Sequence, residues 1–288
     1  MKKYYRFAGI ELCVSTRDEW MYEDDRMLAP FRVESVADPH CFTFTIADSL
    51  TSPAGTLTAV MDNFVVYREG DTHTRYIGAV NGHWTNAYIR ASHSGKDHCV
   101  QLKRESYLTG LGPKAVLNAV QAEHLIARNQ GFVFHCSYIE HNGKAILFTA
   151  PSETGKSTQA DLWHKYRDAE IINGDRAAIR LVNGQLMAEG IPFAGSSSYC
   201  KNRSLPLAAI VYLGQAPQTT IRRMKGYEAF SKIWEGVSVN TWDRVDVELV
   251  SGVVQKIVET IPVFHMPCTP DESAVIALEQ ELRKLENT

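Results

Sequence analysis

The chain has 288 residues, which at roughly 100–200 residues per domain allows one large domain or two ordinary ones and excludes a small disulfide-stapled protein. Hydrophobic residues make up 44% of it and charged residues 22%, a globular composition that argues against disorder and against a fibrous repeat. The 30 lysines and arginines against 33 aspartates and glutamates give a formal charge of -3, without the positive excess that nucleic-acid binding normally requires.

The sequence also lacks the signals that direct a protein into or across a membrane. No run approaches ~18 uninterrupted apolar residues, and residues 1–6 do not lead into the apolar core of a secretory signal. The cysteines form no CxxC pair and no zinc-binding spacing with histidines. We therefore expect a cytoplasmic protein without nucleic-acid or membrane partners, whose thiols are free in a reducing compartment. These thiols belong to Cys13, Cys41, Cys99, Cys136, Cys200 and Cys268.

The first part of the chain, residues 4–103, has the pattern of an antiparallel β-structure. Short runs rich in aromatic and β-branched residues alternate, at intervals of ~8–12 residues, with turn signals such as Glu69-Gly70-Asp71 and Asn81-Gly82. These runs contain no catalytic motif. We predict a β-rich antiparallel head domain over residues 1–110, with a boundary at Gly110-Leu111-Gly112-Pro113.

Residues 111–288 mix helices and strands and are predicted to form the second domain. Apolar positions at helical spacing over residues 114–129 predict one helix. The apolar runs 131–140 and 144–149, on either side of His141-Asn142-Gly143, predict a hairpin.

Further elements are predicted toward the C-terminus. Two runs separated by Asn183-Gly184 predict a second hairpin over residues 177–188, and residues 207–213 predict a buried strand. Thr269-Pro270-Asp271-Glu272 combines Thr269 as an N-cap with a proline and a glutamate at favourable positions, which predicts the start of a final helix. One face of that helix is expected to pack on the core through Val275, Leu278, Leu282 and Leu285.

One segment matches a motif that carries chemistry. The string Ala150-Pro-Ser-Glu-Thr-Gly-Lys-Ser157 fits the Walker A pattern of a phosphate-binding loop (P-loop), except that alanine replaces the first glycine. An apolar strand enters the loop and a helical pattern leaves it, as the motif requires. Backbone N–H groups and the helix N-terminus surround an anion in such a loop, so polyphosphate is the expected ligand. The expected nucleotide-binding residues are Ser152, Glu153, Thr154, Gly155, Lys156, Ser157 and Thr158.

Two residues of the loop have specific roles in this prediction. Lys156 can place its charge between the β- and γ-phosphates, and the Ser157 hydroxyl has the right length to ligate Mg²⁺. ATP and Mg²⁺ are therefore the expected cofactors. A chance match to the pattern is the alternative, and the flanking strand and helix argue against it. The alanine at position 150 is harmless unless the position requires a positive φ.

Asp175 and His135 are the candidates for catalysis outside the loop. Phosphoryl transfer needs a carboxylate near the γ-phosphate, and Asp175 follows a short apolar strand after the loop helix. The alternative is that Asn173-Gly174 is a plain hairpin turn with Asp175 as a solvated neighbour. His135 interrupts an apolar strand, where a histidine is more often a satisfied core residue than a catalytic one.

Residues 131–158 resemble the kinase core of the HPr serine kinase/phosphorylase superfamily, which is structurally related to phosphoenolpyruvate carboxykinase. In that family a histidine precedes a glycine turn, the phosphate loop follows the next strand, and an Asp-Asp pair comes after the loop helix. His135 and the loop match the first two features. Asp175 matches one member of the pair, and Gly174 occupies the place of the other. Segments similar to the branch called HPr kinase-related proteins, which includes serine kinases of lasso-type precursor peptides, are residues 191–197, 201–210 and 267–274.

This resemblance runs from about residue 112 to the C-terminus and implies a P-loop kinase core of mixed α/β class behind the β-rich head. It implies that Asp175, helped by His135, orients or deprotonates an acceptor hydroxyl. Lys156 would hold the transferring phosphates as a third catalytic residue, and Ser157 with Asp175 would hold the metal. Gly174 leaves open whether base function and metal binding are both retained.

Arg203 and Gly195 are two further candidate contacts for phosphate or substrate. Arg203 could neutralise the transferring phosphate, but a solvated basic turn with Lys201 fits the sequence as well. Gly195 with the serines that follow it could form another anion-binding loop, or a flexible polar linker.

The expected function is therefore an ATP-dependent kinase acting on a hydroxyl, with serine in a peptide or protein as the favoured acceptor. A small-molecule hydroxyl kinase on the same core is one alternative. A nucleotide-binding regulatory protein that has lost its chemistry is another, because Gly174 removes a carboxylate. Carboxykinase activity is disfavoured, since 288 residues is short for complete enzymes of that type. The acceptor, the phosphoryl donor, the role of the head domain and the oligomeric state stay open, and a homo-oligomer is compatible with the sequence.

Overall fold

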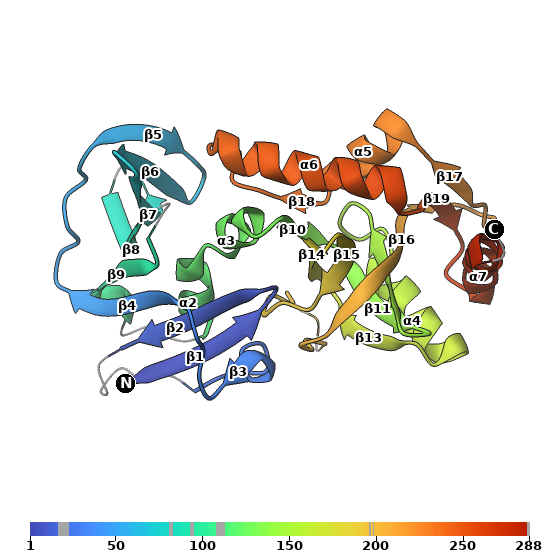
Figure 1. Ribbon diagram of the computed structural model, residues 1–288, viewed down its shortest axis with the longest axis horizontal. Coiled ribbons are helices and arrows are strands. Elements are labelled where there is room, and N and C mark those ends of the chain that lie inside the picture. The colour runs from blue at the N-terminus through green and yellow to red at the C-terminus, as the bar shows by residue number, and fades with distance from the viewer. Residues whose placement is uncertain are drawn as a thin grey trace. The chain divides into compact units, whose positions relative to one another are not determined.

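The computed structural model describes residues 1–16, 23–80, 83–92, 95–107, 113–195, 197 and 199–286 (Figure 1). The fold is mixed α/β, and the chain forms two compact units, Met1–Ala122 and Glu123–Thr288. The predicted boundary between residues 110 and 111 falls outside the described residues. Among the described helices, none combines the length and the apolar character needed to cross a membrane. All six cysteines lie in the described parts, and none of them is joined to another in a disulfide, as predicted.

The first unit is built mainly of β-strands. Tight turns join several of them. Ala8 and Gly9 have φ of 45° and 65°, as a two-residue hairpin turn requires, and Gly70 has φ of 58° in another turn. The elements are β1 (Lys2–Phe7), β2 (Ile10–Ser15), a 3₁₀ turn (Ala29–Phe31), β3 (Arg32–Val33), β4 (His40–Ala47), β5 (Thr56–Val60), β6 (Phe64–Glu69), β7 (Thr72–Val80), β8 (His83–Ser92), β9 (Asp97–Lys103), α1 (Arg104–Tyr107) and α2 (Pro113–Val120).

These strands form one sheet in the order β3-β1-β2-β4-β9-β8-β7-β6-β5. From β5 to β9 each strand pairs antiparallel with the next, which confirms the predicted meander. The antiparallel prediction is wrong for β4, which pairs parallel with both β2 and β9. The physical reason is that long connections precede and follow β4, and only a long connection lets a strand lie parallel to its neighbour. The predicted turn Asn81-Gly82 lies outside the described residues.

The second unit consists of a sheet with helices on both faces. The predicted hairpins are confirmed, although the apolar run 131–140 is divided into two strands at Cys136. The elements are α3 (Ala122–Arg128), β10 (Gly131–His135), β11 (Ser137–His141), β12 (Lys144–Thr149), α4 (Lys156–Arg167), β13 (Glu170–Asn173), β14 (Arg176–Val182), β15 (Gln185–Glu189), β16 (Ser204–Gln215), β17 (Arg222–Met224), α5 (Gly226–Trp234), β18 (Val237–Ser238), α6 (Arg244–Thr260), β19 (Val263–Cys268) and α7 (Glu272–Glu286).

The centre of this sheet is parallel. β12 pairs parallel with β16, and β16 pairs parallel with β19. Antiparallel strands extend the sheet on both sides, with β11 and β13 beyond β12 and with β15, β14 and β10 beyond β16. Strands covered on both faces are expected to be continuously apolar. In β12, Ala145 and Leu147 belong to one core cluster, whereas Ile146 and Phe148 belong to the other.

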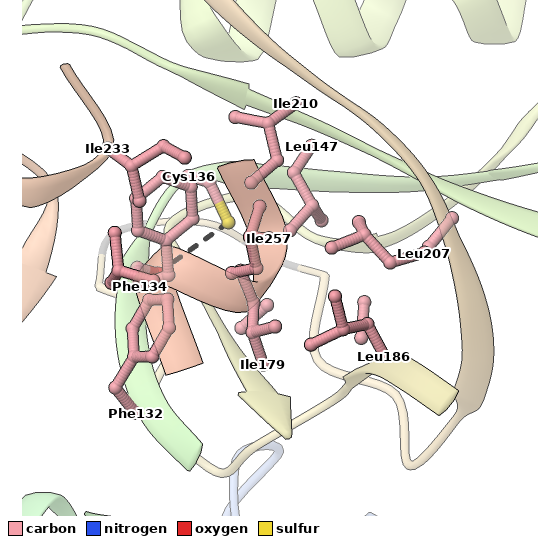
Figure 2. Packing of buried hydrophobic residues seen from close by; sticks show 14 of the residues in the cluster. Phe132, Phe134, Cys136, Leu147, Ile179, Leu186, Leu207, Ile210, Ile233 and Ile257 are labelled. Carbon is pink, nitrogen blue, oxygen red and sulfur yellow. Dashed lines mark hydrogen bonds between the residues drawn. The ribbon is translucent and has the colours of Figure 1, made fainter. Parts of the chain in front are cut away.

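Helices cover each face of the sheet. The cluster that contains Ile146 and Phe148 also includes Trp163 of α4 and Val275 of α7. The opposite cluster includes residues of α5 and α6, and Figure 2 shows Ile257 of α6 among side chains of the strands. The sheet therefore has α4 and α7 on one face and α5 and α6 on the other.

Two local predictions are corrected by the structure. The helix predicted over residues 114–129 is divided into α2 and α3, because Gln121 between them adopts φ of 55°. In the C-terminal helix, Asp271 rather than Thr269 is the N-cap. The Asp271 Oδ1 atom accepts a hydrogen bond of 2.8 Å from the N–H of Ser273.

A buried charge network joins α3 to α6. Asp246 is fully buried, and its carboxylate lies 2.8 Å from Nδ1 of His124 and 3.0 Å from Nε of Arg128. The guanidinium of Arg128 also contacts Asp243, the N-cap residue of α6, at 3.3 Å. Arg128 therefore supplies the positive charge that these two carboxylates require.

We expect Asp246→Ala to lower the free energy of unfolding by about 3–5 kcal/mol, because it leaves Arg128 and His124 without their buried partner. Urea denaturation followed by circular dichroism measures this change. Glu248→Ala on the same helix is the control, since its pair with Arg244 is exposed, and it is expected to cost less than about 0.5 kcal/mol. Equal effects of the two substitutions would contradict the structural role of the network.

Candidate active site

The predicted phosphate loop connects β12 to α4 in the second unit. β12 ends at Thr149 and α4 begins at Lys156, so the predicted order of strand, loop and helix is confirmed. Glu153 and Gly155 have φ of 63° and 110°, which turns the chain sharply before the helix. Gly155 is the N-cap residue and, as a glycine, has no side chain that could cap α4. The N–H groups of the first helical turn therefore have no cap from this residue and suit an anionic ligand.

Ala150 and Lys156 occupy the two ends of the loop. Ala150 does not adopt a positive φ, so alanine in place of glycine causes no backbone strain there, and it packs in the core cluster beside α4. The Lys156 Nζ atom donates hydrogen bonds to the carbonyl oxygens of Ala150, at 3.0 Å, and Pro151, at 3.2 Å. Burial lowers the pKa of Lys156, and the charge of Asp175 acts in the opposite direction. Lys156 therefore lies within electrostatic reach of Asp175.

A second turn, after β13, positions Asp175. Asn173 is fully buried, and its Oδ1 atom accepts hydrogen bonds from the N–H groups of Asp175, at 2.9 Å, and Arg176, at 3.0 Å. Its Nδ2 atom donates to the carbonyl oxygen of Phe193 at 3.1 Å. The turn is not a plain hairpin, because β13 pairs with β11 whereas β14 pairs with β10 and β15. Asn173 therefore holds Asp175 where two parts of the sheet meet.

His135 lies beside Asp175. Its side chain is 35% exposed, so it is not a satisfied core residue, and its Nε2 atom lies 3.5 Å from Oδ1 of Asp175. The His135 N–H donates to the carbonyl oxygen of Gly236 at 2.8 Å, and its own carbonyl accepts from the Thr149 hydroxyl at 2.9 Å. The last hydrogen bond ties the end of β10 to the end of β12, immediately before the loop.

One cleft of about 360 Å³ brings together His135, Lys156 and Asp175. Among the other predicted loop residues, Ser152, Glu153 and Ser157 also line it. Glu153 also lines a second, adjacent cavity. The remaining predicted loop residues line that second cavity. These residues are Thr154, Gly155 and Thr158.

Of the two further candidate contacts for phosphate or substrate, Arg203 lies away from the cleft and Gly195 lies beside Asp175. Arg203 lines neither cavity. Its Nη2 atom lies 2.6 Å from Oε2 of Glu140, as part of an exposed basic turn in which Lys201 pairs with Glu170. Gly195 lies against the carboxylate of Asp175, because a Cβ atom at this position would be 2.8 Å from Cγ of Asp175, and its φ is 54°. A glycine at position 195 is thus required for close approach and for backbone conformation.

Gly174, in the place of the second aspartate of the resembled family, is explained by Ser197. A Cβ atom at position 174 would lie 2.3 Å from the Ser197 hydroxyl oxygen and 2.7 Å from its Cβ. The same hydroxyl accepts a hydrogen bond of 3.1 Å from the N–H of Tyr199. The Ser197 side chain therefore occupies the space that a side chain at position 174 would need.

Introducing the missing carboxylate by Gly174→Asp is expected to lower the free energy of unfolding by about 1–3 kcal/mol, because Ser197 must move. Adding Ser197→Gly to the same protein is expected to restore most of that loss. Thermal denaturation of the two single variants and the double variant gives the coupling energy. Additive effects would show that the two positions do not compete for space.

The Asp175 carboxyl is held in its ionised form. A hydrogen bond from His135 lowers its pKa, burial opposes this, and the charge of Arg176 lowers the pKa further. A carboxyl whose pKa is lower in the folded than in the unfolded chain stabilises the fold above its unfolded pKa of about 3.9. This stabilisation is lost as the pH falls through the lowered pKa of the folded state.

The difference in unfolding free energy between the wild type and Asp175→Asn is therefore expected to shrink as the pH falls below about 3.9. Urea denaturation of both proteins at a series of acidic pH values measures it. A difference that stays constant to the lowest pH at which both fold would contradict the lowered pKa of Asp175.

Asp161 and Tyr199, which were not predicted, also line the cleft, as does Ser197, one of the serines after Gly195 that the sequence offered for an anion-binding loop. Asp161 had a detectable signal, because it follows Ser157 by four residues and therefore shares its face of α4. Tyr199 lies outside any regular element and carries no motif, so only the folded chain brings it to the cleft.

No protein-family model matches this chain, and no curated protein matches it in sequence. Among solved structures, it is similar to the Hpr(Ser) kinase/phosphatase from Coxiella burnetii, with 12% sequence identity and a TM-score of 0.34. That similarity covers 54% of this chain and 93% of the other. At this level of similarity, the function has to be inferred from the residues of the cleft.

Proposed function

We propose that this protein is an ATP- and Mg²⁺-dependent kinase that transfers the γ-phosphoryl group to a hydroxyl, with serine in a peptide or protein as the favoured acceptor. The observation that carries the proposal is the meeting of Lys156 with the His135–Asp175 pair in one cleft. An anion-binding loop and an ionised carboxylate side by side are the two parts that phosphoryl transfer to a hydroxyl requires.

The loop fits a polyphosphate. The N-terminus of α4 begins at a glycine without a side-chain cap, and the ammonium group of Lys156 lies at the same end of the helix. In the structure this ammonium group donates hydrogen bonds to the carbonyl oxygens of Ala150 and Pro151. On binding, we expect Lys156 to exchange these contacts for phosphate oxygens, which are stronger acceptors for a cation.

The cleft also offers oxygen ligands for a cation. Ser157 and Asp175 line it together, with Asp161 one helical turn beyond Ser157. Hydroxyl and carboxylate oxygens of this kind suit Mg²⁺, which when bound would neutralise charge on the phosphates. Ser157 and Asp175 are the proposed ligands.

The acceptor hydroxyl would be activated by the Asp175–His135 pair. The hydroxyl gives its proton to the Asp175 carboxylate as its oxygen forms a bond to the γ-phosphorus, and the bond from that phosphorus to the β-γ bridging oxygen breaks to release ADP. His135 orients the carboxylate through the 3.5 Å contact. A serine hydroxyl is a weak nucleophile at neutral pH, so this positioning is the main contribution of the pair.

Incubation of the full chain with γ-labelled ATP, Mg²⁺ and a panel of acceptors tests the proposal; the panel holds serine, threonine and tyrosine peptides and small hydroxyl compounds. We expect label to appear on serine peptides, and ADP to form only when an acceptor is present. Labelling of small hydroxyl compounds alone would redirect the proposal to a small-molecule kinase.

A nucleotide-binding regulatory protein is a second candidate, which Gly174 favours because the cleft has one carboxylate fewer than the resembled kinases. Its expected result differs from that of a kinase. ATP would bind tightly, and neither ADP nor labelled product would form with any acceptor.

A further inference from the structure

A cavity of about 550 Å³ lies at the amino ends of the parallel strands. It is lined by Ile146 near the start of β12, by Leu207 near the start of β16 and by Pro262, directly before β19. Because β12, β16 and β19 run parallel, these three positions share one edge of the sheet. The phosphate loop follows the other end of β12, and none of the described residues that line the catalytic cleft lines this cavity. The cavity is therefore a separate site at the opposite edge.

Apolar side chains form one part of the cavity wall. Ile146 and Leu207 are 2% and 5% exposed, so the packed core behind them fixes their positions. The apolar face of α7 contributes as well. Leu278 on this face is fully buried in the core, whereas Leu285, about two turns further on, is 37% exposed and lines the cavity. The volume lies in the range of about 300–1,000 Å³ that is usual for sites of small organic molecules.

The other part of the wall carries positive charge. Arg223 comes from β17 and Arg283 from α7, and both line the cavity. Among the described lining residues, Glu279 is the single carboxylate. Its Oε1 atom lies 3.1 Å from Nη2 of Arg283, and its Oε2 atom lies 3.1 Å from Nη2 of Arg167 at the end of α4. Because these two arginines share the charge of Glu279, the cavity keeps an excess of positive charge.

The charge of Arg223 is available to a ligand. The residue is exposed, and it makes no ion pair with any residue that the structure describes. Its neighbour Arg222 differs, since it donates two hydrogen bonds to the carboxylate of Glu228. An arginine of this kind attracts an anion, and its planar guanidinium can bind a carboxylate or phosphate head through two parallel hydrogen bonds.

Charge and apolar surface together select the ligand. A bare inorganic anion satisfies the arginine but leaves the apolar wall in contact with water. An uncharged apolar molecule covers the wall but removes water from the guanidinium group without replacing its hydrogen bonds. A molecule with one anionic head and an apolar body avoids both penalties.

We infer that this cavity binds a small amphiphilic anion, a molecule with one carboxylate or phosphate head and an apolar body. The head binds Arg223, and the body packs against Leu207 and Leu285. The inference goes beyond the proposed function, because it assigns a second ligand to the edge of the sheet opposite the phosphate loop.

Calorimetric titration of the full chain with octanoate, acetate and octylamine tests this inference. Octanoate carries both an anionic head and an apolar body, acetate carries the head alone, and octylamine carries the body with a cationic head. We expect octanoate to bind at least about tenfold more tightly than either of the other two compounds. Burial of about two methylene groups accounts for such a factor over acetate, and the positive charge of the cavity disfavours octylamine.

Two variants test the two parts of the wall. Arg223→Ala is expected to weaken octanoate binding at least about tenfold, because it removes the partner of the head. Arg222→Ala is the matched control, since Arg222 pairs with Glu228 and does not line the cavity, and it should change the affinity less than about twofold. Ala208→Trp, which fills the cavity from β16, is expected to weaken octanoate binding at least about tenfold. If this protein does not fold, the two arginine variants decide.

Several results would overturn the inference. They are the absence of octanoate binding by the wild type, equal affinities for octanoate and acetate or octylamine, and wild-type octanoate binding by Arg223→Ala. Octanoate binding that is lost in Lys156→Ala but kept in Arg223→Ala would place the compound in the catalytic cleft and overturn it as well. Each of these results leaves the kinase proposal standing, because phosphoryl transfer in the absence of octanoate tests that proposal.

Discussion

Replacing Lys156 with alanine is expected to slow phosphoryl transfer by about 100- to 1,000-fold, the usual cost of removing one preorganised charge from developing negative charge. The ammonium group lies at the start of α4, and Lys156 lines the cleft together with Asp175. ATP affinity is expected to fall as well, because the same charge contacts the phosphates in the ground state. Measurement of ADP formation and calorimetric titration with Mg·ATP would give the two effects separately.

Lys144→Ala is the matched control for this substitution. Lys144 is the exposed first residue of β12, the strand whose other end leads into the loop. Its replacement is expected to change the rate less than about twofold, in keeping with a charge outside the site. A Lys156→Ala protein that binds ATP and transfers phosphate at the wild-type rate would exclude the loop from catalysis.

Asp175→Asn is expected to lower kcat by about 100- to 10,000-fold, the range for loss of a general base. Asparagine keeps the size of the side chain and can still accept from Arg176, so the turn built on Asn173 should remain folded. Because Asp175 is also a proposed Mg²⁺ ligand, the affinity for Mg·ATP is expected to fall in the same variant. A fall in kcat with unchanged Mg·ATP affinity would show that Asp175 acts on the acceptor hydroxyl and does not hold the metal.

Asp168→Asn makes the same chemical change outside the site. Asp168 ends α4 with φ of 53°, a conformation that asparagine also tolerates, so the fold should be unaffected. We expect wild-type kinetics from this variant. Wild-type kinetics from Asp175→Asn as well would show that the carboxylate has no part in the reaction.

The elements around the loop were predictable because their signals are local. The continuous apolar run of β12, the glycine at position 155 and the helix that starts at Lys156 are close together in the chain, and their conformations depend mainly on near neighbours. The same holds for the two hairpins with Asn-Gly turns. The prediction of one continuous helix over residues 114–129 was wrong, because no local signal marks the positive φ of Gln121.

The contact between His135 and Asp175 was only partly predictable. His135 and Asp175 stood out by residue type and by a resemblance of order along the chain, but neither feature requires contact. Their 3.5 Å approach depends on β10 pairing with β14, which places the end of one strand beside the start of the other. His135 pairs with Arg176, far along the chain. Pairing between strands so far apart in sequence depends on the whole sheet, and the residue types of the two strands do not specify it.

The sequence by itself determined which groups are available: a loop able to surround phosphate, a lysine and a serine at its end, and a histidine and an aspartate that flank it in the chain. These follow from residue type and short-range spacing, which act before the chain is folded. Only the tertiary structure decided that Ser197 fills the space above Gly174, that Gly195 must lie against Asp175, and that Arg203 pairs with Glu140 away from the cleft. Close packing excludes a second side chain from an occupied volume, and which side chains compete for that volume is known only once distant segments have met.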